Sequence, residues 1–350
     1  MTALGDLLMA RIAATGPITL ADYMAECLLH PKHGYYTTRD PFGVTGDFTT
    51  APEISQMFGE LVGLCLAQAW LDQGSLSPFV LAELGPGRGT LMADVLRASK
   101  AVPGFHAAMR LCLVEASPVL RARQAQALAG VEVTWCDRVQ DLPLDPLFLI
   151  ANEFFDALPI RQFQRVGTGW AERMVGLVAG GLSLGLAPVA RMPGLDGRLA
   201  DVPGGEIVEI CPAAAGIAEE VAQRIAAQGG VAVIVDYGDW HGHGDTVQAV
   251  KSNAYTGVFD APGQADLTAH VDFAALAVTG VAHAYRTQGA FLQRLGIAAR
   301  SARLAAGLTG PALQSHLAAT RRLTDDAEMG SLFKVLALYP LASPPPPGLF

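Results

Sequence analysis

The chain has 350 residues, of which 51% are hydrophobic and 16% charged, and its formal net charge is −9. This length is enough for one large domain with insertions, or for two domains. The acidic balance argues against broad binding of nucleic acids or anionic membranes, which need a basic face. Five scattered cysteines without a C-x-x-C pair, and no apolar run long enough to span a membrane, predict a reduced cytoplasmic protein.

The first 75 residues have a helical pattern. Short helices are expected over 4–14 and 20–28, with Thr19 as the N-cap of the second, and a longer helix over 54–71. The intervening loop, 30–52, is polar, aromatic and rich in glycine and proline. We expect this loop to act as a lid over the part of the chain that follows.

Strands and helices then alternate, which predicts a parallel sheet with α/β architecture. Ligands of such sheets bind at the carboxyl ends of the strands. Each of the first four expected strands ends there in an acid or an amide. These strands cover 79–84, 110–115, 131–135 and 147–151, and the helices between them cover 90–99 and 118–128.

The α/β pattern is interrupted by short extended runs separated by glycines, which predict a β-rich insertion over 161–205. It then resumes, and a second polar loop is expected over 239–272. The later expected elements are helices at 213–227, 291–308 and 311–324 and strands at 231–235, 281–285 and 333–339. We therefore expect an N-terminal helical lid region (1–75), a core (76–160 and 206–340), the insertion, and a tail (341–350) with an exposed polyproline stretch at 344–347.

A glycine turn lies between the first expected strand and its helix, in the run 83–89 (ELGPGRG). Glycines let the backbone approach a ligand closely, and a helix N-terminus offers free N–H groups. The spacing G-x-G-x-G differs from the G-x-G-x-x-G of dinucleotide sites, which counts against a nucleotide-dependent oxidoreductase. Glu83 would repel a pyrophosphate but suits a ligand with an amine or a sulfonium, such as S-adenosylmethionine. The alternative is a turn that serves packing alone.

Acids at the ends of the next two strands fit the same ligand. Glu115 lies 30 residues after Gly85 and can accept hydrogen bonds from ribose hydroxyls. Asp137 ends the third strand and could accept the adenine amino group. Either acid could instead be a solvated strand end.

The fourth strand ends in Asn152 and Glu153, with Asp156 shortly after. We expect these groups to hold and polarise a nucleophilic acceptor. The alternative is that Glu153 and Asp156 cap a turn or helix before Pro159. No metal is expected, because the histidine pairs lack compact ligand spacing and have no cysteine partners. These histidines are His30, His33, His241, His243 and His270.

The run 83–89 with Glu115 resembles the S-adenosylmethionine-binding elements of class I methyltransferases. Longer blocks spread over most of the chain resemble the MidA-like family, which includes a mitochondrial complex I assembly factor that methylates an arginine. These blocks are Tyr23-Met24, 30–36, 46–56, 152–159 (NEFFDALP), 236–238 (DYG), 262–273 and 287–289 (TQG).

The resemblance implies a class I methyltransferase (Rossmann-like) fold: a seven-stranded, mostly parallel sheet with helices on both faces and one antiparallel strand near the C-terminus. It implies methyl transfer from S-adenosylmethionine to a protein arginine, in the known case on a complex I subunit. The expected catalytic residues are Glu153 and Asp156, with Asp47 and Glu53 completing a clamp. The expected cofactor-binding residues are Thr50, Pro52, Glu83, Gly85, Pro86, Gly87, Gly89, Glu115, Asp137 and Asn152.

An alternative of another class is an assembly chaperone with a methyltransferase fold and little catalysis. The mitochondrial relatives carry a targeting sequence that this chain lacks, which predicts a prokaryotic, cytoplasmic protein. We expect no membrane insertion. The acceptor, the methylation product and the oligomeric state, including a homodimer, stay open at this stage.

Overall fold

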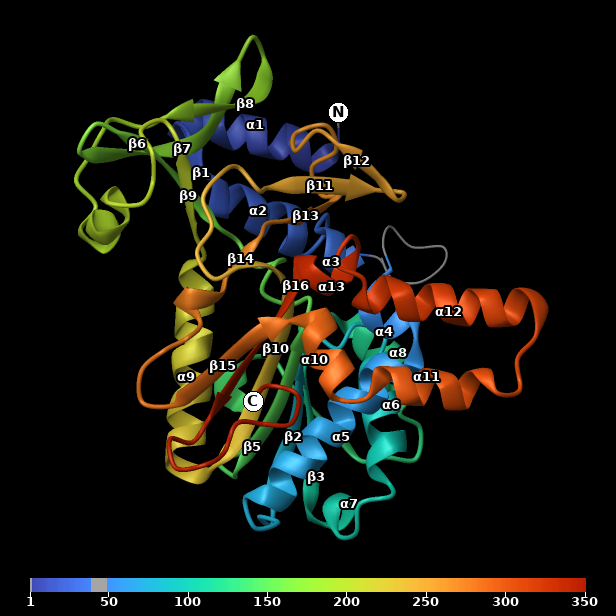
Figure 1. Ribbon diagram of the computed structural model, residues 1–350. Helices are drawn as coiled ribbons and strands as arrows, with labels where there is room; N and C mark the ends of the chain where they lie inside the picture. Colours follow the sequence, from blue (N-terminus) through green and yellow to red (C-terminus); the bar gives the residue numbers. More distant parts are fainter. Residues whose placement is uncertain (1, 39–48) are drawn as a thin grey trace.

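The computed structural model describes residues 2–38 and 49–350. At its centre is an eight-stranded sheet, in which seven strands follow in the order β15-β16-β10-β5-β2-β3-β4 (Figure 1). The eighth, the two-residue β14, pairs with the end of β10. The bounds are β2 (Phe79–Leu84), β3 (Met109–Val114), β4 (Val133–Cys136), β5 (Leu147–Asn152), β10 (Gly230–Asp239), β14 (Val271–Asp272), β15 (Ala282–Thr287) and β16 (Phe333–Tyr339).

The sheet is mixed. Strands β4, β3, β2, β5 and β10 run parallel, whereas β16 is antiparallel to both β10 and β15. All six residues of β2 and of β5 are buried, as expected for central strands covered on both faces. The expected α/β sheet is therefore confirmed.

Two hydrophobic clusters cover the two faces of this sheet. Alternate residues of β2 divide between them, because successive side chains of a strand point to opposite faces: Phe79 and Leu81 join one cluster, Val80 and Ala82 the other. The first cluster includes residues of α5, α6, α10 and α11, and the second includes residues of α9. These helices are α5 (Gln56–Asp72), α6 (Thr90–Ser99), α9 (Pro212–Gln228), α10 (Gln288–Arg294) and α11 (Ile297–Ala305).

The remaining helices are short or peripheral, apart from the N-terminal pair α1 and α2. Thr19 caps α2 with a reciprocal capping box to Asp22, so the expected N-cap is confirmed. No helix in the described part of the chain is long and apolar enough to cross a membrane. The bounds are α1 (Ala3–Thr15), α2 (Leu20–Leu29), α3 (Tyr35–Thr38), α4 (Ala51–Ile54), α7 (Phe105–Ala108), α8 (Pro118–Ala127), α12 (Gly310–Thr324) and α13 (Met329–Leu332), with the short 3-10 turns η1 (Val139–Asp141), η2 (Pro193–Leu199) and η3 (Phe273–Ala275).

Two smaller sheets lie outside the central one. The five-stranded sheet has the order β1-β7-β6-β9, with β8 paired to β7, and the three-stranded sheet has the order β12-β11-β13. The segment 239–272, expected to be a polar loop, thus contains strands. The sequence pattern did not predict them because they are short and carry polar side chains. The bounds are β1 (Ile18–Thr19), β6 (Arg161–Val166), β7 (Gly169–Val178), β8 (Gly181–Leu186), β9 (Ile207–Ile210), β11 (Gln248–Lys251), β12 (Ala254–Thr256) and β13 (Asp266–Thr268).

The N-terminal helices share a third hydrophobic cluster with these outer sheets. It joins Leu4, Leu28 and Tyr35 to Val175 of β7 and Leu267 of β13. In Figure 1 the dark blue α1 and α2 lie beside the orange β11 and β12. Segments from the two halves of the sequence therefore form one shared hydrophobic cluster.

The C-terminal tail is not an exposed stub, so that expectation is wrong. Leu349 is buried and belongs to the hydrophobic cluster around α5, and the Cys65 thiol donates to the Pro347 carbonyl at 3.3 Å. Arg286 and Arg294 donate to the Phe350 carbonyl at 2.8 and 2.7 Å. Burial of Leu349 stabilises the tail on the core, because apolar area is removed from water there, and these hydrogen bonds add to it.

Candidate cofactor and acceptor site

The glycine turn follows β2 directly and leads into α6. Gly85, Gly87 and Gly89 all have positive φ, of 61°, 54° and 84°, which a residue with a side chain resists. A Cβ on Gly85 would also lie 2.9 Å from the Phe154 ring. Glycine is therefore required at position 85 for two reasons: the positive φ, and the lack of room for a side chain beside the Phe154 ring.

A hollow at the carboxyl end of the sheet is lined by three segments, around 50–53, 83–91 and 152–153. It brings together seven of the residues expected to bind the cofactor and two of those expected to be catalytic, Glu53 and Glu153. Sequence reasoning missed the lining role of Arg88, Thr90 and Leu91. The lining residues are Thr50, Pro52, Glu53, Glu83, Gly85, Pro86, Gly87, Arg88, Thr90, Leu91, Asn152 and Glu153.

Two buried oxygens in this hollow lack a donor. Glu83 is 2% exposed, and neither its Oε2 nor the Oδ1 of Asn152 has a hydrogen-bond partner among the described residues. Burial, followed by the nearby Glu115 charge, raises the pKa of Glu83 to about 8. Buried acceptors without donors are costly, so the hollow is suited to a ligand that brings N–H donors and positive charge. The amine and sulfonium of S-adenosylmethionine fit this requirement.

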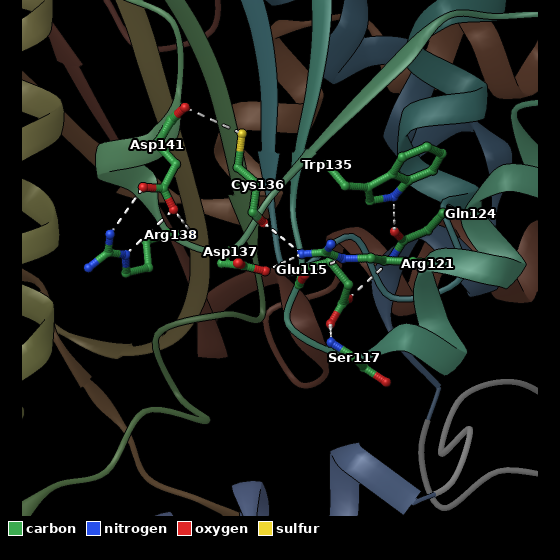
Figure 2. Close-up of polar contacts among 9 residues, drawn as sticks. All are labelled: Glu115, Ser117, Arg121, Gln124, Trp135, Cys136, Asp137, Arg138 and Asp141. Atoms are coloured by element: carbon green, nitrogen blue, oxygen red, sulfur yellow. Dashed lines mark hydrogen bonds and ion pairs between the residues drawn. The ribbon is translucent and has the colours of Figure 1, made fainter. Parts of the chain in front are cut away.

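Glu115 lies just beyond β3, and its carboxylate is fixed by two donors (Figure 2). The backbone N–H of Ser117 donates to it at 2.8 Å and the amide of Gln124 at 3.1 Å. The Gln124 amide also donates to the carbonyl of Gly87 at 2.8 Å, and Trp135 donates to Gln124. Burial raises the pKa of Glu115, and these donors lower it. The fully buried Gln124 therefore ties the glycine turn to the expected ribose acid, a link that no sequence pattern signalled.

The structure places Asp137 outside the hollow. Its side chain is 78% exposed and accepts from Arg121 at 2.6 Å (Figure 2). Gly89 and Glu115 do not line the hollow either, although each adjoins a lining segment. Asp47, expected in the acceptor clamp, lies outside the described residues.

The turn after β5 carries the acids expected to act on the acceptor. Glu153 adopts an unusual left-handed φ of 51°, and its Oε1 accepts from the Ala51 backbone at 3.1 Å and from Asn152 at 3.0 Å. Burial, then the charge of Asp156, raises the pKa of Glu153 to about 7. The positive charge of Arg322 on α12 opposes that shift. Arg322 therefore lies near Glu153, and sequence reasoning did not predict this cation.

Asp156 lies next to Glu153 but behind the lined hollow. It is 6% exposed, and its Oδ1 has no partner among the described residues. Burial raises its pKa to about 6, while the Tyr237 hydroxyl lowers it. Glu53, on α4, accepts a hydrogen bond from Thr90 at 2.6 Å and so faces the start of α6. Within residues 2–38 and 49–350, no group of three or more His, Cys, Asp or Glu side chains is arranged to hold a metal ion.

A glycine turn between a buried parallel strand and a helix, with acids at neighbouring strand ends, defines a Rossmann-like enzyme of the methyltransferase class. The model of a family of S-adenosyl-L-methionine-dependent methyltransferases, Methyltransf_28, matches residues 61–291. The chain belongs to this family, and it is an S-adenosylmethionine-dependent methyltransferase. Family membership favours an enzyme over the assembly-chaperone and oxidoreductase alternatives.

Two protein arginine methyltransferases and one crystal structure align with nearly the whole chain. The mitochondrial protein arginine methyltransferase NDUFAF7 of Bos taurus is 37% identical over 95% of this chain and 82% of its own length. The Drosophila melanogaster homologue is 37% identical over 96% of this chain and 85% of its own. A crystal structure of a COG1565 superfamily member from Burkholderia thailandensis, bound to S-adenosyl-homocysteine, is 30% identical in sequence with a TM-score of 0.83. The match covers 99% of this chain and 94% of that one.

The expectation of a cytoplasmic location is wrong. The relatives that match most of this chain, including those of Bos taurus, Drosophila melanogaster and Homo sapiens, are named as mitochondrial proteins.

Proposed function

We propose that this enzyme transfers a methyl group to an arginine side chain of a protein, with a respiratory complex I subunit, or a similar protein during its assembly, as the acceptor. One observation carries the proposal: two carboxyl groups follow β5 at the cofactor hollow, the half-buried Glu153, which lines it, and the buried Asp156, whose charge acts on Glu153. One oxygen of Asp156 lacks a donor among the described residues, and a guanidinium offers five N–H donors. The names of the relatives support the same acceptor class.

The cofactor supplies an electrophilic methyl group when it is bound. In our proposal Glu83 and Asn152 accept hydrogen bonds from its amine end, and the backbone at Gly85, Pro86, Gly87 and Gly89 contacts it closely. Glu115 then accepts from the ribose hydroxyls and Asp137, at the rim, from the adenine. Thr50 and Pro52 close the hollow from the other side.

The chain's own acids prepare the nucleophile. A guanidinium is protonated at every ordinary pH and is therefore a poor nucleophile. Glu153 would hold it by charge-assisted hydrogen bonds and accept the proton that the attacking nitrogen loses as the N–C bond forms and the C–S bond breaks. Asp156 would fix the far side of the guanidinium, with Glu53 and Asp47 completing the clamp. Most of the rate gain comes from this alignment.

We also propose that the chain divides into a catalytic core, a lid, an insertion and a tail. The seven strands that follow one another in the central sheet form the catalytic core, built from 76–160 and 206–340. Residues 1–75 act as a lid, because α4 carries Thr50, Pro52 and Glu53 to the hollow. The β-rich 161–205 is an insertion and 341–350 a tail.

The test compares cells with and without the gene by mass spectrometry of arginine methylation. Deletion should remove methylation from specific arginines, the wild-type gene should restore it, and Glu153→Gln should not. Purified Glu153→Gln should still bind S-adenosylmethionine, with a dissociation constant within about tenfold of the wild-type value, since the cofactor's amine end faces Glu83 and Asn152. Unchanged arginine methylation in the deletion strain would refute the acceptor class, and full restoration by Glu153→Gln would remove that acid from the mechanism.

A further inference from the structure

A buried carboxylate on the neighbouring strand holds the turn that carries the two acceptor acids. Asp236 lies near the end of β10 and has no exposed surface. Its Oδ2 accepts from the backbone N–H groups of Phe155 at 3.0 Å and Asp156 at 3.2 Å, and its Oδ1 accepts from that of Tyr237 at 2.9 Å. Both oxygens are therefore committed to backbone donors, from two different segments.

This turn has an unfavourable backbone that needs such support. Glu153 has a left-handed φ of 51°, which costs a residue with a side chain free energy and persists only where the surroundings over-determine it. The backbone bonds of the turn to its neighbours are from Glu153 to the Val235 carbonyl at 2.9 Å and from Ala269 to the Asp156 carbonyl at 3.0 Å. Between these two points, the Asp236 side chain accepts the backbone N–H groups of residues 155 and 156.

The three carboxyl groups also influence one another's ionisation. Burial, then the charges of Asp156 and Glu153, raises the pKa of Asp236 well above its usual value. Among the described residues, the groups that act on this trio include Arg322 of α12, the hydroxyl of Tyr237 on β10 and the hydroxyl of Tyr36 on α3. Lys334 of β16 lies opposite Asp236 in the strand register. Because the coupling between carboxylates is mutual, a change at Asp236 should move the titration of the other two acids.

We infer that Asp236 is a positioning residue for methyl transfer, which fixes the turn after β5 so that Glu153 and Asp156 meet the acceptor nitrogen. This inference rests on the proposed function above. Asp236 does not line the cofactor hollow, so its effect should fall on transfer rather than on cofactor binding. A displaced turn would misplace the acids, and a misplacement of about 1 Å costs roughly 100-fold in rate.

The test uses Asp236→Asn, which keeps the shape but replaces one acceptor oxygen by an NH₂ group that cannot accept. Where this variant does not fold, Asp236→Ser replaces it. The matched control is Glu209→Gln on β9. Glu209 is a half-buried carboxylate that likewise accepts three hydrogen bonds, from Gln162 and from the N–H and hydroxyl of Thr246, but it is not part of the site.

Proteins extracted from the deletion strain serve as the acceptor, and labelled methyl transfer to arginine is measured at saturating S-adenosylmethionine. We expect Asp236→Asn to lose about 100-fold in rate. The dissociation constant for S-adenosylmethionine, from calorimetry, should stay unchanged. The rise of rate with pH should move to lower pH, because ionised Asp236 disfavours the ionised forms of Glu153 and Asp156, and the variant lacks that charge. Glu209→Gln should keep the wild-type rate and pH profile.

Three outcomes overturn the inference: a wild-type rate in the Asp236 variant, a loss of cofactor binding equal to the loss of rate, or a rate loss without a shift of the pH profile. Failure of the proposed function is distinguishable, because the wild-type enzyme would then transfer no methyl group to arginine in the same extract.

Discussion

Cofactor binding should release a proton near neutral pH, and Glu83 is the reason. The pKa of this buried carboxyl is about 8, so roughly 90% of it carries a proton at pH 7 before the cofactor binds. An ammonium group beside it favours the ionised form, which expels that proton. We therefore expect release of about 0.9 proton from Glu83 per cofactor bound, and affinity that rises about tenfold per pH unit between pH 6 and 7.

The assay is titration calorimetry at pH 7 in two buffers of different ionisation enthalpy, such as phosphate and Tris. Glu153, with a pKa of about 7, also faces the hollow and can add to the release. The contribution of Glu83 is therefore the difference between the wild type and Glu83→Gln. Equal proton release by the two proteins, or equal heats in the two buffers for the wild type, would refute the assignment of Glu83 to the amine end.

Two further predictions separate the site from the scaffold. Gly85→Ala should weaken S-adenosylmethionine binding about tenfold or more, whereas Gly130→Ala should leave it unchanged. Both substitutions cost about 1–2 kcal/mol for a left-handed backbone, but only the first meets a side chain, that of Phe154. Equal calorimetric constants would contradict this. Arg224→Ala should lower the free energy of unfolding, measured in urea, by about 3 kcal/mol, because the buried guanidinium donates to three backbone carbonyls. Cofactor affinity should not change. A loss below about 1 kcal/mol would count against this role of Arg224.

The sequence predicts that these polar side chains gather at one place because parallel strands align their ends. Acids and amides that follow buried runs must gather at one edge of the sheet, and Glu83, Asn152 and Glu153 do line one hollow there. The alternating glycines predict the turn because a positive φ is a preference of the individual residue, which can be recognised without knowledge of the fold.

Supporting contacts are harder to predict because they join residues far apart in the chain. Gln124 resembles any other glutamine of an amphipathic helix, yet it is fully buried and bonds to both Gly87 and Glu115. Asp236 is 80 residues from Asp156, whose N–H it binds. Asp137 is paired with Arg121 of α8, and Leu349 is buried in the hydrophobic cluster that residues of α5 and of the sheet also form.

The cluster shared by the first helices and the outer sheets has a consequence for synthesis on the ribosome. The hydroxyl of Tyr36 donates to Asp266, 230 residues later, and Leu4 and Leu28 pack in one cluster with Leu267. At roughly 5–20 residues per second, the partner strand emerges about 10 to 50 s after the helices that need it. During that interval the apolar faces of α1 and α2 are incompletely covered, so the nascent chain should be a client for chaperones that bind hydrophobic segments.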